Sequence, residues 1–209
     1  MRFRTTPKDF RLWIMDLHAT MKRNSVTLPQ ISKARIRVDH QGLHAMATDR
    51  YIIVDSVLKS DIPDGLTIKD FHDAKPGLVS FKEWDVLKNF AASVHGVGFT
   101  NEGLEIFTDK SFTFGERFDT ATASFTVPFD SEADSHRFPN LDQLIETARK
   151  NNREVSESGR DGFRMELVKH IKGVMIEPRS IGFGKPGFIH TQPPRATGII
   201  MPVRIGLEG

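Results

Sequence analysis

Apolar residues along this chain follow a helical spacing in some segments and the every-second-residue alternation of β-strands in others. Three segments carry apolar residues on one helical stripe and predict amphipathic helices: residues 8–22, 81–92 and 163–172. Ser80 directly precedes the second of these and is a suitable N-cap. In the third, the side chains expected to point inward are those of Phe163, Leu167, Val168 and Ile171.

Short apolar or alternating runs between these helices predict strands. They cover residues 36–38, 43–47, 52–58, 97–100, 104–108, 111–114, 121–128, 174–178, 180–183 and 198–205. The order is helix, strands, helix, strands, helix, strands, with less in the second half than in the first, which indicates an incomplete repeat. This order argues against a simple parallel βαβ architecture and favours an α+β fold.

Two polar segments interrupt the pattern. Residues 61–77 contain several Gly, Pro and Asp residues and are interpreted as an inserted loop or a short hairpin. The stretch IETARKNNREVSESGRDG, residues 145–162, lacks a strong apolar period. We interpret it as an inter-domain connection that is helical in its first half.

The composition sets limits on the kind of protein. With 209 residues and 38% hydrophobic content, the chain can bury one good core, or one domain with a smaller partner. The formal net charge of +2 does not by itself indicate a nucleic-acid binder, although a basic stripe on one face would not be visible in that total. The absence of cysteine excludes disulfides, thiolate zinc sites and cysteine nucleophiles. The sequence contains neither a membrane-length apolar run nor a signal-peptide pattern, so we expect a soluble cytoplasmic protein.

The common catalytic motifs are missing from the sequence. GxxxxGK[ST], GxGxxG after a strand, HExxH and GxSxG do not occur. The glycine-rich stretch GFGKPGF, residues 182–188, could be a phosphate loop, but Pro186 and the prolines after it oppose a following helix, which favours a turn. His40 and His44 are separated by a Gln-Gly turn, and no histidine pair has metal-ligand spacing. We therefore expect no metal, no cofactor and no enzymatic activity.

The segment HAMATDRYIIVDSVL, residues 44–58, places a polar elbow between two apolar runs and predicts a corner between two strands. With the residues before it, ARIRVDHQGLHAMATDRYIIV (34–54) resembles the strand–turn–strand elbow of bacterial DNA polymerase III β sliding clamps. RFPNL (137–141) is similar to the segment that closes a clamp domain, and GIIMPVRI (198–205) to the C-terminal signature of that family. The family elbow usually continues Gly-His-Arg, where this chain has Arg50, Tyr51 and Ile52.

The resemblance implies a clamp fold, with antiparallel sheets outside and helices on one face. Residues 1–143 would form a complete clamp-like domain similar to the family's middle domain. Residues 144–209 would form a partial domain similar to the closing half of the last one. A hydrophobic pocket between these domains receives short peptides of Gln-Leu-x-Leu-Phe type in the family. By position, the pocket residues here would be Thr48, Arg50, Tyr51, Ile53, Pro139, Leu144, Ile199, Met201, Pro202 and Val203.

Clamp helices also contact the phosphates of duplex DNA without reading its sequence. The basic residues expected on that face are Lys8, Arg11, Lys22, Arg23, Lys82, Lys88, Arg164, Lys169 and Lys172. The implied function is a non-enzymatic processivity factor that tethers polymerases and repair proteins to DNA in the cytoplasm, at the nucleoid. The implied partners are duplex DNA, clamp-motif proteins, a clamp loader and further copies of the chain, with no membrane. The alternative is a clamp-fold binding or regulatory module that forms no ring.

Overall fold

The computed structural model describes residues 2–3, 5–39, 41–58, 76–94, 104–105, 111–117, 122–128, 130–131, 138–151, 161–177, 186–201 and 203–204. Its helices are α1 (Pro7–Asn24), α3 (Phe81–Val94), α4 (Leu141–Asn151) and the 3-10 helix η2 (Met165–Leu167). The strands of its largest sheet are β2 (Lys33–Asp39), β3 (Gly42–Thr48), β4 (Ile52–Leu58), β5 (Gly77–Ser80), β9 (Asp130–Ser131), β11 (Val174–Glu177), β12 (Gly187–Thr191) and β13 (Ala196–Ile200). The remaining strands are β1 (Arg2–Phe3), β6 (Leu104–Glu105), β7 (Ser111–Arg117), β8 (Thr122–Pro128), β10 (Asp161–Gly162) and β14 (Val203–Arg204).

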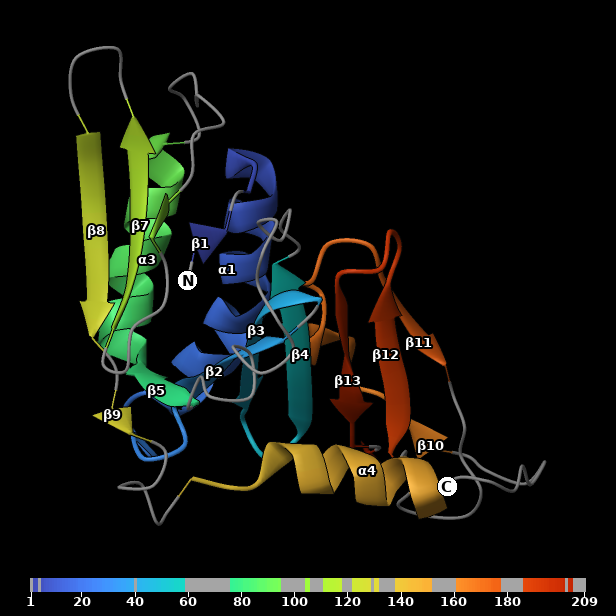
Figure 1. Ribbon diagram of the computed structural model, residues 1–209. Helices are drawn as coiled ribbons and strands as arrows, with labels where there is room; N and C mark the ends of the chain where they lie inside the picture. Colours follow the sequence, from blue (N-terminus) through green and yellow to red (C-terminus); the bar gives the residue numbers. More distant parts are fainter. Residues whose placement is uncertain are drawn as a thin grey trace.

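The main sheet is antiparallel and contains strands from both the N-terminal and the C-terminal parts of the chain. Its strand order is β11-β12-β13-β4-β3-β2-β5-β9. Strand β13, from the C-terminal part, pairs with β4, from the N-terminal part, and places Ile199 opposite Ile53 (Figure 1). The domain division expected between residues 143 and 144 stays a prediction, and helix α4 spans that point.

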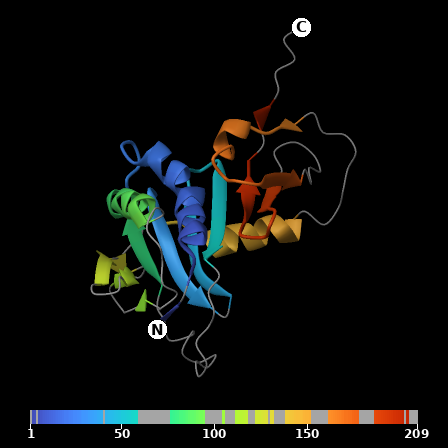
Figure 2. The same ribbon diagram turned by 90° about the horizontal axis from the view of Figure 1, so that it is seen from above.

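Helices α1 and α3 lie together on one face of this sheet (Figures 1 and 2). Helix α1 begins where the Thr6 hydroxyl accepts the Asp9 N–H at 3.1 Å, and α3 begins where the Ser80 hydroxyl accepts the Glu83 N–H at 3.3 Å, which confirms that N-cap. Two tryptophans, Trp13 and Trp84, lie fully buried between them, with ring centroids 5.1 Å apart. Each indole N–H donates to a backbone carbonyl, so the aromatic core contains no unsatisfied indole.

Helix α4 covers the opposite face of the sheet. Its Leu141 and Ile145 are buried against Met46, Ile53 and Ile199, which project from three neighbouring strands. The first half of the polar stretch 145–162 is therefore helical, as expected. Only one narrow stripe of α4 is apolar because the helix rests on the sheet surface with its other sides in solvent.

The segment 163–172 differs from its prediction. It was expected to be an amphipathic helix, and its Leu167, Val168 and Ile171 are buried as that prediction requires. However, only the short η2 forms there. The backbone there closes tight turns instead, with the Ile171 N–H donating to the Val168 carbonyl at 2.8 Å, and Arg23 donates to the carbonyls of Glu166 and Leu167 at 3.4 and 2.8 Å.

The C-terminal strands also differ from the prediction. The expected strand 198–205 is divided into β13 and β14, with Met201 between them outside any strand. Strand β12 was not predicted, because its first residues belong to the glycine-rich stretch that was interpreted as a turn. At Gly187 a Cβ would lie 2.6 Å from the Phe163 ring, so a larger residue there would displace that ring. The strands expected at 97–100 and 180–183 lie outside the described residues.

Candidate functional site

The polar elbow at residues 48–52 is held by the side chain of Asp49. One carboxylate oxygen accepts the N–H groups of Tyr51 and Ile52, both at 3.0 Å. The other forms an ion pair with Arg23 of α1. The Asp49 side chain is only 1% exposed, so it acts inside the molecule and not as a surface charge. Asp49 was not among the predicted site residues, although its place between Thr48 and Arg50 in an apolar context was a usable signal.

Arg50 adopts the left-handed backbone conformation that glycine favours. Its φ is 80°, and it stands at the position where the clamp elbow has Gly. The turn is closed by Thr48, whose hydroxyl donates to the Ile52 carbonyl at 2.9 Å and accepts the Arg50 N–H at 3.2 Å. The Arg50 guanidinium lies over the Tyr51 ring, 5.8 Å from its centroid. Both side chains consequently lie on the outside of the elbow.

The structure brings the elbow and the C-terminal strand together. The Met201 N–H donates to the Tyr51 carbonyl at 2.7 Å, directly after the paired strands that carry Ile53 and Ile199. Close approach is required at Gly198, where a Cβ would lie 1.9 Å from the Ile53 carbonyl oxygen. Six of the ten predicted pocket residues are thereby connected, namely Thr48, Arg50, Tyr51, Ile53, Ile199 and Met201.

Helix α4 forms the third side of this surface. Its N-terminus is capped by Asn140, whose side-chain oxygen accepts the Gln143 N–H at 3.1 Å, and Asp142 forms an ion pair with Arg35 of the sheet at 2.8 Å. Pro139 is half-buried just before the helix, and Leu144 is 47% exposed on it. Pro202 lies outside the described residues, and the backbone of Val203 belongs to β14, which pairs with β10.

Around α4, three large apolar side chains remain in solvent: Tyr51 is 50%, Leu144 47% and Met201 38% exposed. They come from the elbow, from α4 and from the end of β13. The buried cluster of Met46, Ile53, Leu141, Ile145 and Ile199 belongs to the same three parts of the chain. We call this surface, formed by the elbow, α4 and the end of β13, the outer apolar surface.

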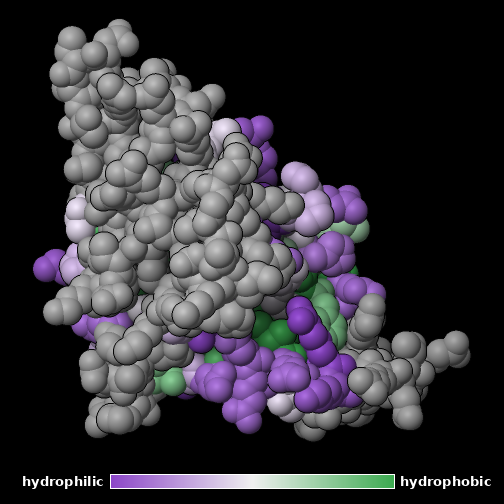
Figure 3. All heavy atoms as spheres, viewed as in Figure 1, coloured by the Kyte–Doolittle hydropathy of each residue, from purple (hydrophilic) through white to green (hydrophobic). Residues whose placement is uncertain are grey.

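A hollow of about 410 Å³ lies beside α4 on the same face of the sheet. Figure 3 shows apolar surface here, above the polar outer row of α4 and over β12 and β13. The lining residues were not predicted from the sequence, because β12 was not predicted. They are Arg149, Glu177, Phe188, Ile189, His190, Thr197 and Gly198.

The predicted DNA-facing residues fall into three groups. Lys8, Arg11 and Lys22 are exposed on one side of α1, three, eleven or fourteen positions apart in sequence, so they form one stripe. Lys82, which is exposed on α3, completes this first group of exposed helix residues. The second group, Arg23 and Lys88, is already paired, with Asp49 and Asp85 respectively. The third, Arg164, Lys169 and Lys172, is exposed in and around η2.

The contact between α1 and α3 contains a histidine. His18 Nε2 lies 2.7 Å from Asp85 Oδ1, and Lys88 Nζ lies 3.1 Å from the same oxygen. Burial lowers the pKa of His18 below 6.5, because desolvation outweighs the hydrogen bond to Asp85. Burial likewise lowers the pKa of His170, with the positive charge of Arg23 acting in the same direction.

Among the residues that the structure describes, no group of three or more His, Asp or Glu side chains is arranged to hold a metal ion. No helix in the same residues has the length and apolarity to cross a membrane.

Comparison with solved structures identifies the fold. The C. crescentus beta sliding clamp matches with a TM-score of 0.61 at 13% identity, over 98% of this chain and 65% of that one. The DNA polymerase III beta subunit of Thermotoga maritima matches with a TM-score of 0.58 at 12% identity, over 98% and 65%. The Helicobacter pylori beta clamp, solved with a DNA ligase peptide, matches with a TM-score of 0.54 at 11% identity, over 100% and 68%.

The chain thus has the fold of bacterial β sliding clamps, as the motifs implied, and spans about two thirds of the length of the clamps it matches. No family model and no curated protein matches the sequence. At this level of identity the likeness concerns the fold.

Proposed function

We propose that this protein is a non-enzymatic, sliding-clamp-like factor that tethers polymerase or repair partners to duplex DNA. The observation that carries the proposal is the outer apolar surface, in a chain with the clamp fold. Tyr51, Leu144 and Met201 remain in solvent there, around a buried cluster to which the two ends of the chain both contribute. The H. pylori clamp with this fold was solved with a DNA ligase peptide, which favours a peptide as the occupant here.

The chemistry of this surface suits a short peptide with apolar anchors. Burying one Leu or Phe side chain of the partner would contribute about 1.5–3 kcal/mol before ordering costs. Met201 has a flexible thioether side chain that adapts to different partners. Pro139, Pro202 and Val203 are proposed as further members of the site from their positions in the sequence, and Pro202 and the Val203 side chain lie outside the described residues.

The DNA half of the proposal rests on the exposed stripe of α1. Lys8 and Lys22 lie 14 positions apart on one side of the helix, with Arg11 between them, a length of about 21 Å. Within the described residues none of them forms an ion pair, so their charges are available to backbone phosphates. Such contacts are independent of sequence and weaken with salt. A clamp loader and a ring of several copies, active at the nucleoid in the cytoplasm, complete this proposal.

Peptide binding tests the first half. A fluorescein-labelled Gln-Leu-Ser-Leu-Phe peptide would be titrated with the protein and its anisotropy followed. Met201→Ala should weaken binding by about 1–2 kcal/mol, or roughly fivefold to thirtyfold. Met175→Ala is the matched control, since Met175 is 45% exposed but lies on the edge strand β11. Equal affinity of the wild type and Met201→Ala, or no binding to the wild type, would remove the peptide site.

The alternative is a clamp-fold binding module without a ring. Light scattering after size-exclusion chromatography of the whole chain separates the two possibilities. A protein that remains a monomer at micromolar concentration favours the module, because the proposed ring consists of several copies. A closed oligomer favours the tethering ring.

A further inference from the structure

Helix α4 covers apolar residues that a partner peptide would need. Ile53 and Ile199, two of the predicted pocket residues, are each only 6% exposed, and Met46 beside them is fully buried. The side chains of α4 that pack onto them are those of Leu141 and Ile145. We call Met46, Ile53 and Ile199 the apolar floor. A peptide anchor cannot contact this floor while α4 lies on it.

Few contacts hold α4 on the sheet. Among residues 141–150 only Leu141 and Ile145 are buried. The ion pair between α4 and the sheet joins Asp142 to Arg35, and the Asp142 side chain is 50% exposed, so water and salt weaken the pair. A helix of 11 residues is marginal in water on its own. Helix α4 therefore depends on its docking, and a competitor for the floor can release it.

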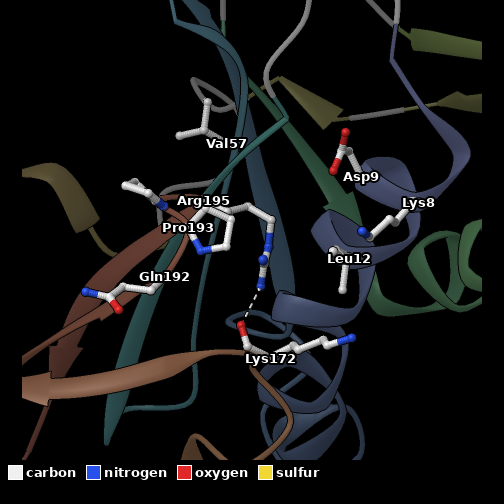
Figure 4. Close-up of a pocket in the computed structure, with 9 residues that line it drawn as sticks. Lys8, Asp9, Leu12, Val57, Lys172, Gln192, Pro193 and Arg195 are labelled. Carbon is white, nitrogen blue, oxygen red and sulfur yellow. Dashed lines mark hydrogen bonds between the residues drawn. The ribbon is translucent and has the colours of Figure 1, made fainter.

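The apolar floor does not depend on α4, because its strands are held from the other side of the sheet. Strands β4 and β13 pair directly with each other. Arg195, just before β13, donates two hydrogen bonds to the carboxylate of Asp16 on α1, at 2.7 and 2.8 Å. A third goes to the Lys172 carbonyl at 3.1 Å, the dashed line in Figure 4. The floor consequently keeps its shape when α4 leaves, which lowers the cost of binding a ligand there.

We infer that α4 is a built-in competitor for the peptide site, and that a partner peptide reaches the apolar floor by displacing it. The inference rests on the proposed peptide site and assigns that site its regulation. Leu141 and Ile145 lie one helical turn apart and offer two aliphatic side chains to the floor. The Leu and Phe anchors of a Gln-Leu-x-Leu-Phe peptide offer the same apolar chemistry, so helix and peptide compete for one surface.

The docked state leaves a place for the first contact with the partner. Tyr51 and Met201 stay exposed at the edge of the floor while α4 covers its centre. A peptide can thus bind at the edge before its anchors replace Leu141 and Ile145. Its apparent affinity is lowered by the fraction of molecules in which α4 is docked.

The test is a variant of the whole protein that weakens the docking of α4 and leaves the floor intact. The fluorescein-labelled Gln-Leu-Ser-Leu-Phe peptide would be titrated with wild type, with Ile145→Ala and with Thr147→Ala, and its anisotropy followed. Release of a helix that is docked in about 90% of molecules would raise the apparent affinity about tenfold, so Ile145→Ala should bind at least about threefold more tightly than wild type. Thr147 is exposed on the same helix, and Thr147→Ala, the matched control, should bind like the wild type.

Amide hydrogen exchange of residues 141–150 gives the direction of the movement. When the peptide is added to the wild type, exchange in this helix should become faster, because α4 leaves the sheet and loses its hydrogen bonds. A helix that forms a fixed wall of the site would instead exchange more slowly once the peptide is bound.

Two results would overturn the inference, and they are distinguishable. If Ile145→Ala, folded by circular dichroism, binds the peptide no more tightly than the wild type, or if the exchange of α4 slows, then α4 is a fixed wall and the proposed peptide site stands. If neither the wild type nor Ile145→Ala binds the peptide, the proposed peptide site fails as well.

Discussion

Removing the Asp49 carboxylate should unfold the elbow and destabilise the whole molecule. In Asp49→Ala the N–H groups of Tyr51 and Ile52 lose their acceptor; the buried Ile52 group costs about 1–3 kcal/mol and the part-buried Tyr51 group less. The Arg23 guanidinium loses its buried partner as well. The Arg23 side chain is 28% exposed and keeps the Leu167 carbonyl as an acceptor, so this second cost stays below the roughly 3–5 kcal/mol typical of a fully buried pair. We therefore expect a loss of about 3–5 kcal/mol from the free energy of unfolding.

Asp49→Asn separates these two contributions. The amide oxygen can still accept the N–H groups of Tyr51 and Ile52, but the amide NH₂ now faces Arg23. The loss should be about 1–3 kcal/mol, smaller than for Asp49→Ala. Combining Asp49→Asn with Arg23→Ala in a double-mutant cycle should give a coupling energy of about 1–3 kcal/mol.

The assay is urea unfolding followed by tryptophan fluorescence. Trp13 and Trp84, the two tryptophans of the chain, are fully buried between α1, α3 and the sheet, so their emission reports on the loss of the core. An Asp49→Ala protein within about 1 kcal/mol of the wild type would contradict the reasoning, because its elbow N–H groups would then have to be satisfied without the carboxylate. A coupling energy near zero would show that Arg23 and Asp49 are independent.

Three further predictions concern other parts of the structure. Gly198→Ala places a methyl group 1.9 Å from the Ile53 carbonyl in the native geometry, so strand β13 should separate from β4; amide hydrogen exchange of β13 should rise sharply, and unchanged protection would contradict the register. Ile145→Ala should cost about 2–4 kcal/mol in urea unfolding, whereas exposed Leu144→Ala on the same helix should cost less than about 0.5 kcal/mol; equal losses would argue against the docking of α4. Burial holds the pKa of His18 below 6.5, so the unfolded state binds more protons, and the free energy of unfolding should fall as the pH drops from about 6.5 through the lowered pKa. His18→Gln should flatten this pH dependence, and an unchanged profile in that variant would contradict the assignment to His18.

Helix α1 was predictable because several local signals agree. Its apolar stripe, its Thr-Pro start and its charged outer side all indicate a helix at the same place, and the structure forms it from Pro7 to Asn24. The elbow was predictable for a similar reason, since two apolar runs flank a short polar motif. The local sequence does not show which distant residue each polar side chain pairs with in the fold. Arg23 looks like a free surface cation, and only the fold brings it to Asp49 and to the carbonyls near η2.

The parts that were missed depend on contacts between distant segments. Strand β12 begins in a glycine-rich stretch, and its strand conformation follows from pairing with β13 and from the Phe163 ring that packs over Gly187. The position of α4 depends on just two buried side chains, Leu141 and Ile145, which are too few to give a clear period in a polar segment. The hollow beside α4 depends on both features, so its lining could not be predicted.

The central claim is that one molecule holds a partner peptide and duplex DNA at the same time. The most direct measurement uses the labelled peptide at saturating protein and then adds unlabelled duplex in low salt. The outer apolar surface and the basic stripe of α1, proposed to bind peptide and DNA, lie on opposite faces of the sheet, so the anisotropy should rise again as the larger ternary complex forms. A fall to the value of the free peptide, or no change while DNA binding is seen separately, would contradict tethering.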